Sequence, residues 1–263
     1  MTFPYKHVLV IGATSGIGRA MSDHFIAEGI KVTAVGRRQD RLEEFVSKHG
    51  SENASGVPFD ISELDKIPGF AQDVMSAHPS IDCIFLNAAV QHAYDFSNPS
   101  TIDLGVFNHE MTVNFSSFVA LTHALLPHLL SREEKSSLVF TGSPIGLIPA
   151  FMLPGYSASK AALDAFIMCL REQLRDTKIS TMHISPGPVM TEMHDNVTAQ
   201  QSVKKFGMSM EEFIEQSYAG LVEGRADIFP GCVGGSTKEQ FLEIVKGREE
   251  AFERLSKMIR NFH

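Results

Sequence analysis

An α/β fold built on one parallel, doubly wound sheet is predicted by two features of the amino-acid sequence. Short β-branched segments alternate with longer amphipathic segments, and a glycine-rich turn joins the first of each kind. Parallel strands need long crossover connections, which helices usually supply, so the alternation places helices on both faces of the sheet. Right-handed crossovers then extend the sheet in both directions from its first strand.

Seven strands are expected, the last of them short. They are the segments 7–11, 31–35, 55–59, 81–86, 138–141, 179–184 and 226–229. The expected helices are 17–29, 38–49, 64–77, 104–130, 154–177 and 238–262. Together these elements predict a Rossmann-like sheet with the strand order 3-2-1-4-5-6-7. The last helix is expected to pack on the domain, with a subunit contact as the weaker alternative.

A single domain, residues 1–263, is expected because no internal repeat or low-complexity linker divides the chain. The region 191–224 interrupts the alternation after the sixth strand. Ligands of such sheets bind near the carboxyl ends of the strands, so this region is interpreted as a substrate lid. A pair of surface helices with no gating role is the alternative.

The composition argues against several classes of protein. With 23 Lys and Arg against 31 Asp and Glu, the net charge is −8, and no long basic run suggests a nucleic-acid partner. No apolar run approaches the roughly 20 residues of a membrane span, and the N-terminus lacks the form of a signal peptide. The cysteines are widely spaced and the histidines show no zinc-type spacing, so a cytoplasmic protein without a bound metal is expected.

The turn 12–18 carries Gly12, Gly16 and Gly18 between the first strand and the first helix. A diphosphate needs a tight turn, closely approaching backbone N–H groups and the positive end of a helix, and glycines supply the first two. The turn is therefore interpreted as the phosphate cradle of a dinucleotide site. A tight turn that binds no ligand is the alternative.

The end of the second strand indicates which dinucleotide would bind. An acidic residue there would accept hydrogen bonds from the ribose of NAD, and Gly36 cannot do so. Arg37 can pair with the 2′-phosphate of NADP, Arg38 can add to that pairing or face solvent, and Ser15 can donate to the same phosphate. NADP(H) is thus the expected cofactor, unless Arg37 only stacks on the adenine.

Tyr156 and Lys160 lie four residues apart at the start of a predicted helix and therefore share one face. Reduction of a carbonyl needs a hydride at carbon and a proton at oxygen, and a cofactor supplies only the hydride. A nearby ammonium is expected to make the phenol a better acid, so that Tyr156 donates the proton. Ser143, just past the fifth strand, is expected to hold the substrate oxygen.

This ordered set of residues resembles the short-chain dehydrogenase/reductase family. The resemblance rests on the glycine turn, Asp60-Ile61, Asn87-Ala88-Ala89, Asn114, Ser143, Tyr156-x-x-x-Lys160, and Pro186-Gly187 followed by Thr191. It implies that Asn114 anchors a water linking Lys160 to solvent, unless Asn114 only bridges a helix irregularity. It also implies a homodimer or homotetramer, formed through the long helices 104–130 and 154–177.

The same resemblance implies a set of cofactor-binding residues. Asp60 would bind the adenine amine, unless it only caps a helix; Asn87 would lie near the adenosine ribose, and Val189 and Thr191 would meet the nicotinamide amide and the diphosphate. The full expected set is Gly12, Thr14, Ser15, Gly16, Ile17, Gly18, Arg37, Arg38, Asp60, Ile61, Asn87, Ala88, Tyr156, Lys160, Pro186, Gly187, Val189 and Thr191.

Four positions depart from the family pattern. Ile11 and Leu86 replace polar residues that usually tie neighbouring loops together, so the central strands are expected to be looser there or held by apolar packing instead. Ala89 adds a methyl group beside the cofactor. Gly142 stands where a serine is common.

The expected activity is NADP(H)-dependent interconversion of a carbonyl compound and an alcohol, with Asn114, Ser143, Tyr156 and Lys160 as the catalytic set. Reduction of an imine or conjugated C=C bond on the same scaffold is one alternative, and a catalytically silent NADP-binding protein is another. The substrate is expected to have an apolar body, because apolar residues flank the expected site. These are Pro144, Ile145, Phe151, Met152, Leu153, Met190 and Met193.

Overall fold

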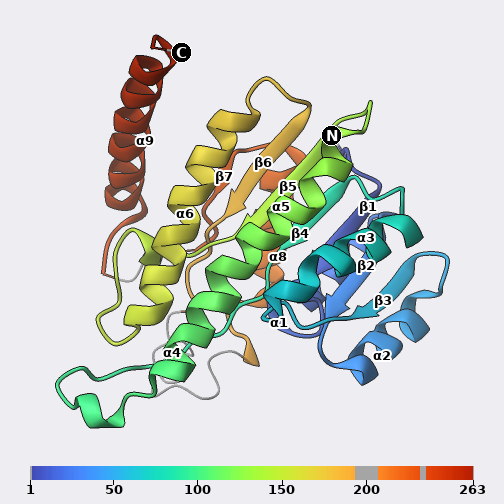
Figure 1. The fold of residues 1–263 in the computed structure, drawn as a ribbon, viewed down its shortest axis with the longest axis horizontal. Coiled ribbons are helices and arrows are strands. Elements are labelled where there is room, and N and C mark those ends of the chain that lie inside the picture. The colour runs from blue at the N-terminus through green and yellow to red at the C-terminus, as the bar shows by residue number, and fades with distance from the viewer. Residues whose placement is uncertain (1, 193–206, 232–234, 263) are drawn as a thin grey trace.

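The computed structural model describes residues 2–192, 207–231 and 235–262, and it contains a seven-stranded parallel sheet (Figure 1). The strand order is β3-β2-β1-β4-β5-β6-β7, which confirms the predicted order. The strands are β1 (His7–Ile11), β2 (Lys31–Gly36), β3 (Ala54–Pro58), β4 (Cys83–Leu86), β5 (Ser136–Thr141), β6 (Ile179–Ile184) and β7 (Asp227–Ile228). Every residue of the central strands β1, β4 and β5 is buried, as expected for strands covered on both faces.

Two apolar cores lie on opposite faces of the sheet. One core joins the sheet to α3 (Ile67–Ala77), α5 (Ser117–Leu130) and α6 (Pro154–Leu174). The other joins it to α1 (Gly16–Ala27), α2 (Gln39–His49) and α8 (Met210–Val222). Figure 1 shows α5 and α6 running in front of the strands. This arrangement leaves the carboxyl ends of the strands as the edge where loops gather.

The predicted helix 104–130 is divided into α4 (Leu104–Met111), a π-helical turn (Thr112–Ser116) and α5. By length and composition alone it could cross a membrane, with a mean hydropathy of 1.3, which corrects the expectation that no apolar segment is long enough. Phe118, Leu121 and Leu125 are nonetheless completely buried against the sheet and its neighbouring helices. A core helix of a folded domain has the same composition.

Of the predicted lid 191–224, the structure describes residues 191–192 and 207–224, and most of this part belongs to a helix that packs on the domain. Met208 pairs with Val189 in an isolated bridge, and α8 follows behind a Ser209–Glu212 capping box. Phe213 and Leu221 of α8 are buried in the core beneath the sheet, so this helix supports the domain. Residues 193–206 lie outside the described residues.

Helix α9 (Lys238–Arg260) begins with a second capping box, formed by Thr237 and Gln240. Figure 1 shows α9 standing beside α6 and extending away from the body of the domain. Its first turn packs through Phe241, whose ring lies 5.2 Å from that of Phe229. Several apolar side chains of α9 remain exposed: Leu242, Ile244, Leu255, Met258 and Ile259. The prediction of a packing helix is confirmed at Phe241 and at Ser256, which are buried, while these apolar side chains stay exposed.

Candidate functional site

A cleft of about 730 Å³ opens at the carboxyl ends of the central strands. It is lined by residues from the turn after β1, the ends of β2 and β3, the segments after β4, β5 and β6, and the first turns of α6. Of the predicted site residues, only Gly18 and Asn114 do not line it. The cleft thus brings together segments far apart in the sequence.

The glycine turn has the shape of a phosphate cradle. Gly12 has a φ of +89°, and a Cβ atom at this position would come within 2.7 Å of Ala88. A Cβ atom at Gly18 would overlap the carbonyl oxygen of Gly12, which explains why α1 can pack so closely under β1. The N-terminus of α1 points into the cleft behind Ser15, whose side chain makes no capping hydrogen bond. These residues fit a dinucleotide diphosphate.

Asn87 ties three strand ends together beneath the cradle. Its side-chain amide donates to the Gly12 carbonyl over 3.4 Å, and its Oδ1 accepts from the Thr141 hydroxyl over 3.0 Å. The polar ties expected to be lost at Ile11 and Leu86 are replaced by apolar packing. These two residues are register partners on β1 and β4, and both are completely buried.

The outer end of the cleft carries exposed charge. Arg38 donates to the Thr14 hydroxyl over 3.0 Å and to Ser15, so its guanidinium lies against the cradle. Arg37 turns toward Asp60, with 3.7 Å between nitrogen and oxygen. A Cβ atom at Gly36 would lie 2.6 Å from Thr14 Cγ2, so an acidic side chain could not be accommodated there without rearrangement.

Asp60 has two roles in this region. Its Oδ1 accepts from the backbone N–H and the hydroxyl of Ser62, over 2.9 and 2.8 Å, which forms a local turn and not the helix cap of the alternative interpretation, since Glu63 precedes the helical turn Leu64–Lys66. These bonds and Arg37 hold the pKa of the Asp60 carboxyl below its usual range, despite partial burial. The other carboxylate oxygen of Asp60, Oδ2, lies 3.7 Å from Arg37, and both residues line the cleft.

The inner end of the cleft carries buried charge. Tyr156 and Lys160, on the first two turns of α6, are 8% and 1% exposed. The Lys160 ammonium donates to the Thr141 carbonyl over 2.8 Å and lies 5.5 Å from the centre of the Tyr156 ring. Burial lowers the pKa of Lys160 to about 7.

The pKa of Tyr156 is raised, which differs from the expectation that the ammonium makes this phenol a better acid. Burial is the main cause, the Glu110 carboxylate adds to it, and a hydrogen bond with Ser143 opposes it. Burial disfavours the charged forms of both groups, so it moves the two pKa values apart, that of Tyr156 upward and that of Lys160 downward. The phenol is protonated at neutral pH.

Asn114 lies in the π-helical turn and is completely buried. Its Oδ1 accepts from the Val90 N–H, and its amide donates to the Val90 carbonyl and to Ser159 Oγ, over 2.8 and 3.1 Å. The side chain thus ties the π-helical turn to the segment after β4 and to α6. Because these bonds occupy the side chain, a water near Lys160 would have to bind the backbone of this turn.

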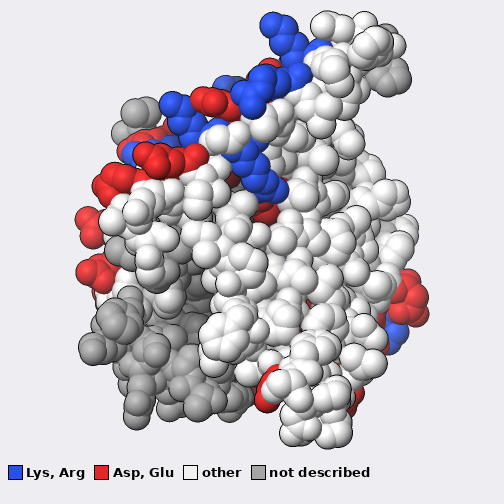
Figure 2. All heavy atoms as spheres, turned by 90° about the vertical axis from the view of Figure 1, so that its left-hand side faces the viewer, with Lys and Arg blue, Asp and Glu red and all other residues white. Residues whose placement is uncertain are grey.

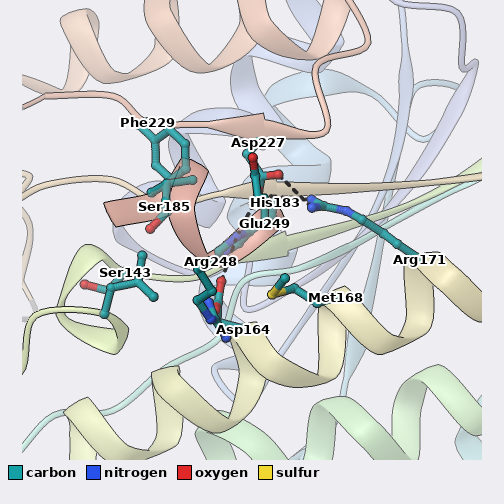
Figure 3. A pocket seen from close by; sticks show the side chains of 12 residues that line it. Ser143, Asp164, Met168, Arg171, His183, Ser185, Asp227, Phe229, Arg248 and Glu249 are labelled. Atoms are coloured by element: carbon teal, nitrogen blue, oxygen red, sulfur yellow. Dashed lines mark hydrogen bonds and ion pairs between the residues drawn. The ribbon is translucent and has the colours of Figure 1, made fainter. Parts of the chain in front are cut away.

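Behind Ser143 lies a small cavity of about 40 Å³ (Figure 3). Figure 3 shows ionisable side chains on one side of it, including His183, Asp227 and Arg171, with Ser143 on the other. A Cβ atom at Gly142 would overlap His183 Nε2. The departure at Gly142 is therefore explained, because the imidazole occupies the space that a serine side chain would need.

His183 is held in this position by acidic residues. Its Nδ1 lies 3.2 Å from Asp227 and 3.7 Å from Asp164, which in turn pairs with Arg248 of α9. Burial lowers the pKa of His183, although Asp227 opposes the shift. The sequence analysis missed this cluster, since its members come from β6, β7, α6 and α9.

The expected apolar pocket is confirmed for some residues and wrong for others. Pro144, Ile145 and Leu153 line the cleft, and Ile148 joins them. Phe151, Met152 and Met190 do not line it and are exposed instead, while Met193 lies outside the described residues. The sequence analysis also missed His92, which lines the cleft, and the buried carboxylate of Glu110.

Comparisons with known proteins point to one family. A family model described as short chain dehydrogenase matches residues 6–202. The chain is 29% identical over 221 residues to the uncharacterized oxidoreductase DltE of Bacillus subtilis, covering 84% of this chain and 86% of that protein. It is 32% identical over 244 residues to dehydrogenase/reductase SDR family member 7B of Rattus norvegicus, covering 89% of this chain and 72% of that protein. Of a similar protein from Anopheles gambiae, the chain spans only 61%.

Solved structures show the same fold. A short chain dehydrogenase/reductase from Burkholderia phymatum, in complex with NAD, superposes with a TM-score of 0.79 at 20% identity, covering 97% of this chain and 96% of that one. A short-chain dehydrogenase from Streptomyces avermitilis gives 0.77 at 20% identity, covering 98% and 97%. With its sheet order, glycine cradle and matched sequence, the chain belongs to the short-chain dehydrogenase/reductase family of oxidoreductases.

Proposed function

We propose that the protein is an NADP(H)-dependent oxidoreductase that interconverts a carbonyl compound and an alcohol, with Tyr156 as the acid and base. The observation that carries this proposal is that Ser143, Tyr156 and Lys160 line the same cleft as the glycine cradle. A nicotinamide cofactor, when bound there, supplies or accepts the hydride at carbon. The protein's own residues must then hold the oxygen and move the proton.

Tyr156 serves as the proton donor in reduction. Its raised pKa keeps the phenol protonated at neutral pH, so the proton is available to the alkoxide that develops on the substrate oxygen. The Ser143 hydroxyl donates a hydrogen bond to the same oxygen and stabilises its developing charge. In the reverse direction Tyr156 first gives its proton to the neutral amine of Lys160, and the resulting phenolate accepts the proton from the alcohol.

Lys160 replaces the proton that Tyr156 gives up. With a pKa of about 7, its ammonium can lose a proton near neutral pH, which an ordinary lysine cannot do. The Thr141 carbonyl fixes the position of Nζ, and Asn87 fixes Thr141 through its hydroxyl. Lys160 also adds positive charge beside the phenolate that forms after proton transfer.

The preference for NADP(H) is supported by the outer end of the cleft. Arg38 lies against Thr14 and Ser15 of the cradle, where its guanidinium can pair with a 2′-phosphate. Arg37 adds a second cation, partly engaged by Asp60. Crowding at Gly36 opposes the acidic side chain that would select NAD.

Product analysis with deuterated cofactor tests this function. The protein would be incubated with NADPH carrying deuterium at the transferred position, and with a panel of aldehydes, ketones, imines and conjugated enones. An alcohol with one deuterium on the carbinol carbon is the expected product. Deuterium found only on an amine carbon or at a former C=C bond would assign the chemistry to another bond. No transfer to any compound, despite NADPH binding, would indicate a silent cofactor-binding protein.

We also propose that the chain forms a homodimer or homotetramer. The support is the apolar surface left on its helices, including Leu104 and Leu130 at the ends of the 104–130 segment and Leu255 on α9. Figure 2 shows charged side chains gathered toward one upper edge of the face turned to the viewer, with mostly uncharged atoms in its middle. Light scattering measures the mass, and a value near 28.9 kDa would contradict self-association.

A further inference from the structure

Glu110 is a buried carboxylate next to the reacting end of the cleft. It lies on the last turn of α4, shortly before Asn114, and is 0% exposed. Its Oε2 would lie 3.1 Å from a Cβ atom at Gly155, the residue that precedes Tyr156. The carboxylate therefore faces the start of α6, beside the proposed proton donor.

The partners of Glu110 come from the segment that follows β4. The Tyr94 hydroxyl donates to Oε2 over 2.9 Å, and His92 Nδ1 lies 3.4 Å from the same oxygen. The other carboxylate oxygen, Oε1, is buried without a hydrogen-bond partner among the described residues. His92 is thus the one group at Glu110 in the described chain that can carry a positive charge.

A buried carboxylate without a counter-charge is strongly disfavoured, so this pair is expected to hold one shared proton. Burial raises the pKa of Glu110, in keeping with that expectation. Either Glu110 is protonated and donates to His92 Nδ1, or Glu110 is ionised and His92 is an imidazolium. In both states the hydrogen on His92 lies at Nε2, the nitrogen remote from Glu110.

His92 lines the cleft beside Glu110. Nδ1 is buried against Glu110, yet the side chain as a whole is 43% exposed and lines the cleft. Because Glu110 touches both His92 and the start of α6, the imidazole lies at the substrate end. The cleft also has apolar lining residues, among them Ile145, Ile148 and Leu153.

We propose that His92, backed by Glu110, is a substrate-recognition residue that donates a hydrogen bond from Nε2 to an acceptor oxygen on the substrate, most strongly to a carboxylate. The preferred substrate class is then a carbonyl compound with an apolar body and a carboxylate on that body. A carboxylate is favoured over a neutral oxygen because a hydrogen bond to a charged acceptor is stronger. This inference rests on the proposed function for the statement that the substrate carries a carbonyl group. The recognition of the acceptor oxygen by His92 does not depend on that function.

Three matched aldehydes test the proposal: 4-carboxybenzaldehyde, methyl 4-formylbenzoate and 4-methylbenzaldehyde. With NADPH, kcat/KM is expected to be highest for the carboxylate and lowest for the methyl compound. A hydrogen bond to a charged group corresponds to roughly 10- to 100-fold in such a ratio. His92→Leu is expected to reduce the carboxylate-to-methyl ratio to about one, mainly through the KM of the carboxylate. His123→Leu, an exposed histidine on α5, is the matched control and should leave the ratio unchanged.

Glu110→Gln provides a second variant of nearly equal size. It removes the shared proton, so the preference for the carboxylate should fall while the preference for the methyl ester over the methyl compound falls less. Circular dichroism checks that both variants are folded. A carboxylate preference that survives in His92→Leu, or its absence from the unchanged protein, overturns the proposal.

Calorimetric titration separates this inference from the proposed reaction. The same three compounds are titrated into the protein with NADP+, with and without the His92→Leu change. Tighter binding of the carboxylate that is lost in His92→Leu supports the recognition site, even if none of the three aldehydes is turned over. Equal binding of all three compounds, or no binding of the carboxylate, contradicts it, even if the aldehydes are reduced.

Discussion

Cations occur at both ends of the cleft, but their surroundings differ. At the outer end Arg37 and Arg38 are 62% and 42% exposed in their side chains. At the inner end Lys160 is nearly fully buried, and its pKa falls to about 7. Exposed charge is screened by water and salt and is suited to holding a phosphate. Buried charge is poised between two protonation states and is suited to proton transfer.

Glu110 extends this contrast, because it places a second buried ionisable group at the inner end. Each charged residue there is held by a specific partner: Lys160 by the Thr141 carbonyl, and Glu110 by Tyr94 and His92. At the outer end one carboxylate serves two cations, because Glu192 forms ion pairs with both Arg38 and Arg41. Substitutions should therefore have larger consequences at the inner end than at the outer end.

Lys160→Met should have the largest effect. Turnover should fall at least 100-fold, since the proton supply to Tyr156 is lost. Stability should change in its dependence on pH. Because the folded pKa of about 7 is below the unfolded value, protonated Lys160 destabilises the fold, fully so below pH 7. Between pH 7 and the unfolded pKa the unfolded chain binds more protons, so stability rises with pH, by up to about 1.4 kcal/mol per unit.

Urea unfolding between pH 6 and 9 measures this slope. Lys160→Met should flatten it and should raise stability at pH 6. Lys246→Met, which removes an exposed lysine of α9, is the matched control and should keep the slope of the unchanged protein. If the unfolding free energy of the unchanged protein and of both variants depended on pH with the same slope, the lowered pKa of Lys160 would be contradicted.

Gly142→Ser tests the packing behind the inner end. The serine side chain would overlap His183, so unfolding free energy should fall by about 1–3 kcal/mol. In a His183→Ala background the same change should cost much less, because the space is free. A double-mutant cycle by urea unfolding gives the coupling. Additive effects would mean that the two positions do not compete for one space.

Arg38→Ala should act on cofactor choice rather than on chemistry. The KM for NADPH should rise roughly tenfold while the KM for NADH changes little, since a charge-assisted hydrogen bond to a phosphate is lost. Adding salt should narrow the difference between the variant and the unchanged protein. Arg254→Ala on α9, also exposed, is the control. Equal changes with both cofactors would remove Arg38 from phosphate recognition.

Arg37→Ala should have the smallest effect, only a few-fold on the KM for NADPH, because its side chain is more exposed and partly paired with Asp60. Measured beside Arg38→Ala, it ranks the two arginines. A larger rise in the KM for NADPH in Arg37→Ala than in Arg38→Ala would make Arg37, and not Arg38, the main ligand of the 2′-phosphate.

The sheet and the cradle could be predicted because their signals are local. Runs of β-branched residues predict the strands, and the position of Gly12 and Gly18 between a strand and a helix predicts the cradle. The same holds for Tyr156 and Lys160, which are one helical turn apart. Asn114 was predicted as a catalytic residue, whereas the π-helical turn around it was not, because periodicity does not resolve a single widened turn.

The buried partners could not be predicted, because they depend on contacts between distant elements. His183 meets Gly142 only when β5 and β6 pair, and Glu110 meets His92 only when α4 packs near the segment after β4. The raised pKa of Tyr156 was missed for the same reason, since burial outweighs the nearby ammonium. The helical pattern of α8 is equally compatible with a lid and with packing under the sheet, so its burial in the core could not be predicted either.

Tyr156→Phe tests most directly whether the buried phenol is the proton donor. Aldehyde reduction and NADPH binding would be measured on the same preparation, with Tyr5→Phe, a buried tyrosine outside the cleft, as the control. Turnover is expected to fall by about 100-fold or more while the Kd for NADPH stays unchanged, because only the transferable proton is removed. Turnover equal to that of Tyr5→Phe, with NADPH still bound, would contradict the assignment of Tyr156 as the acid.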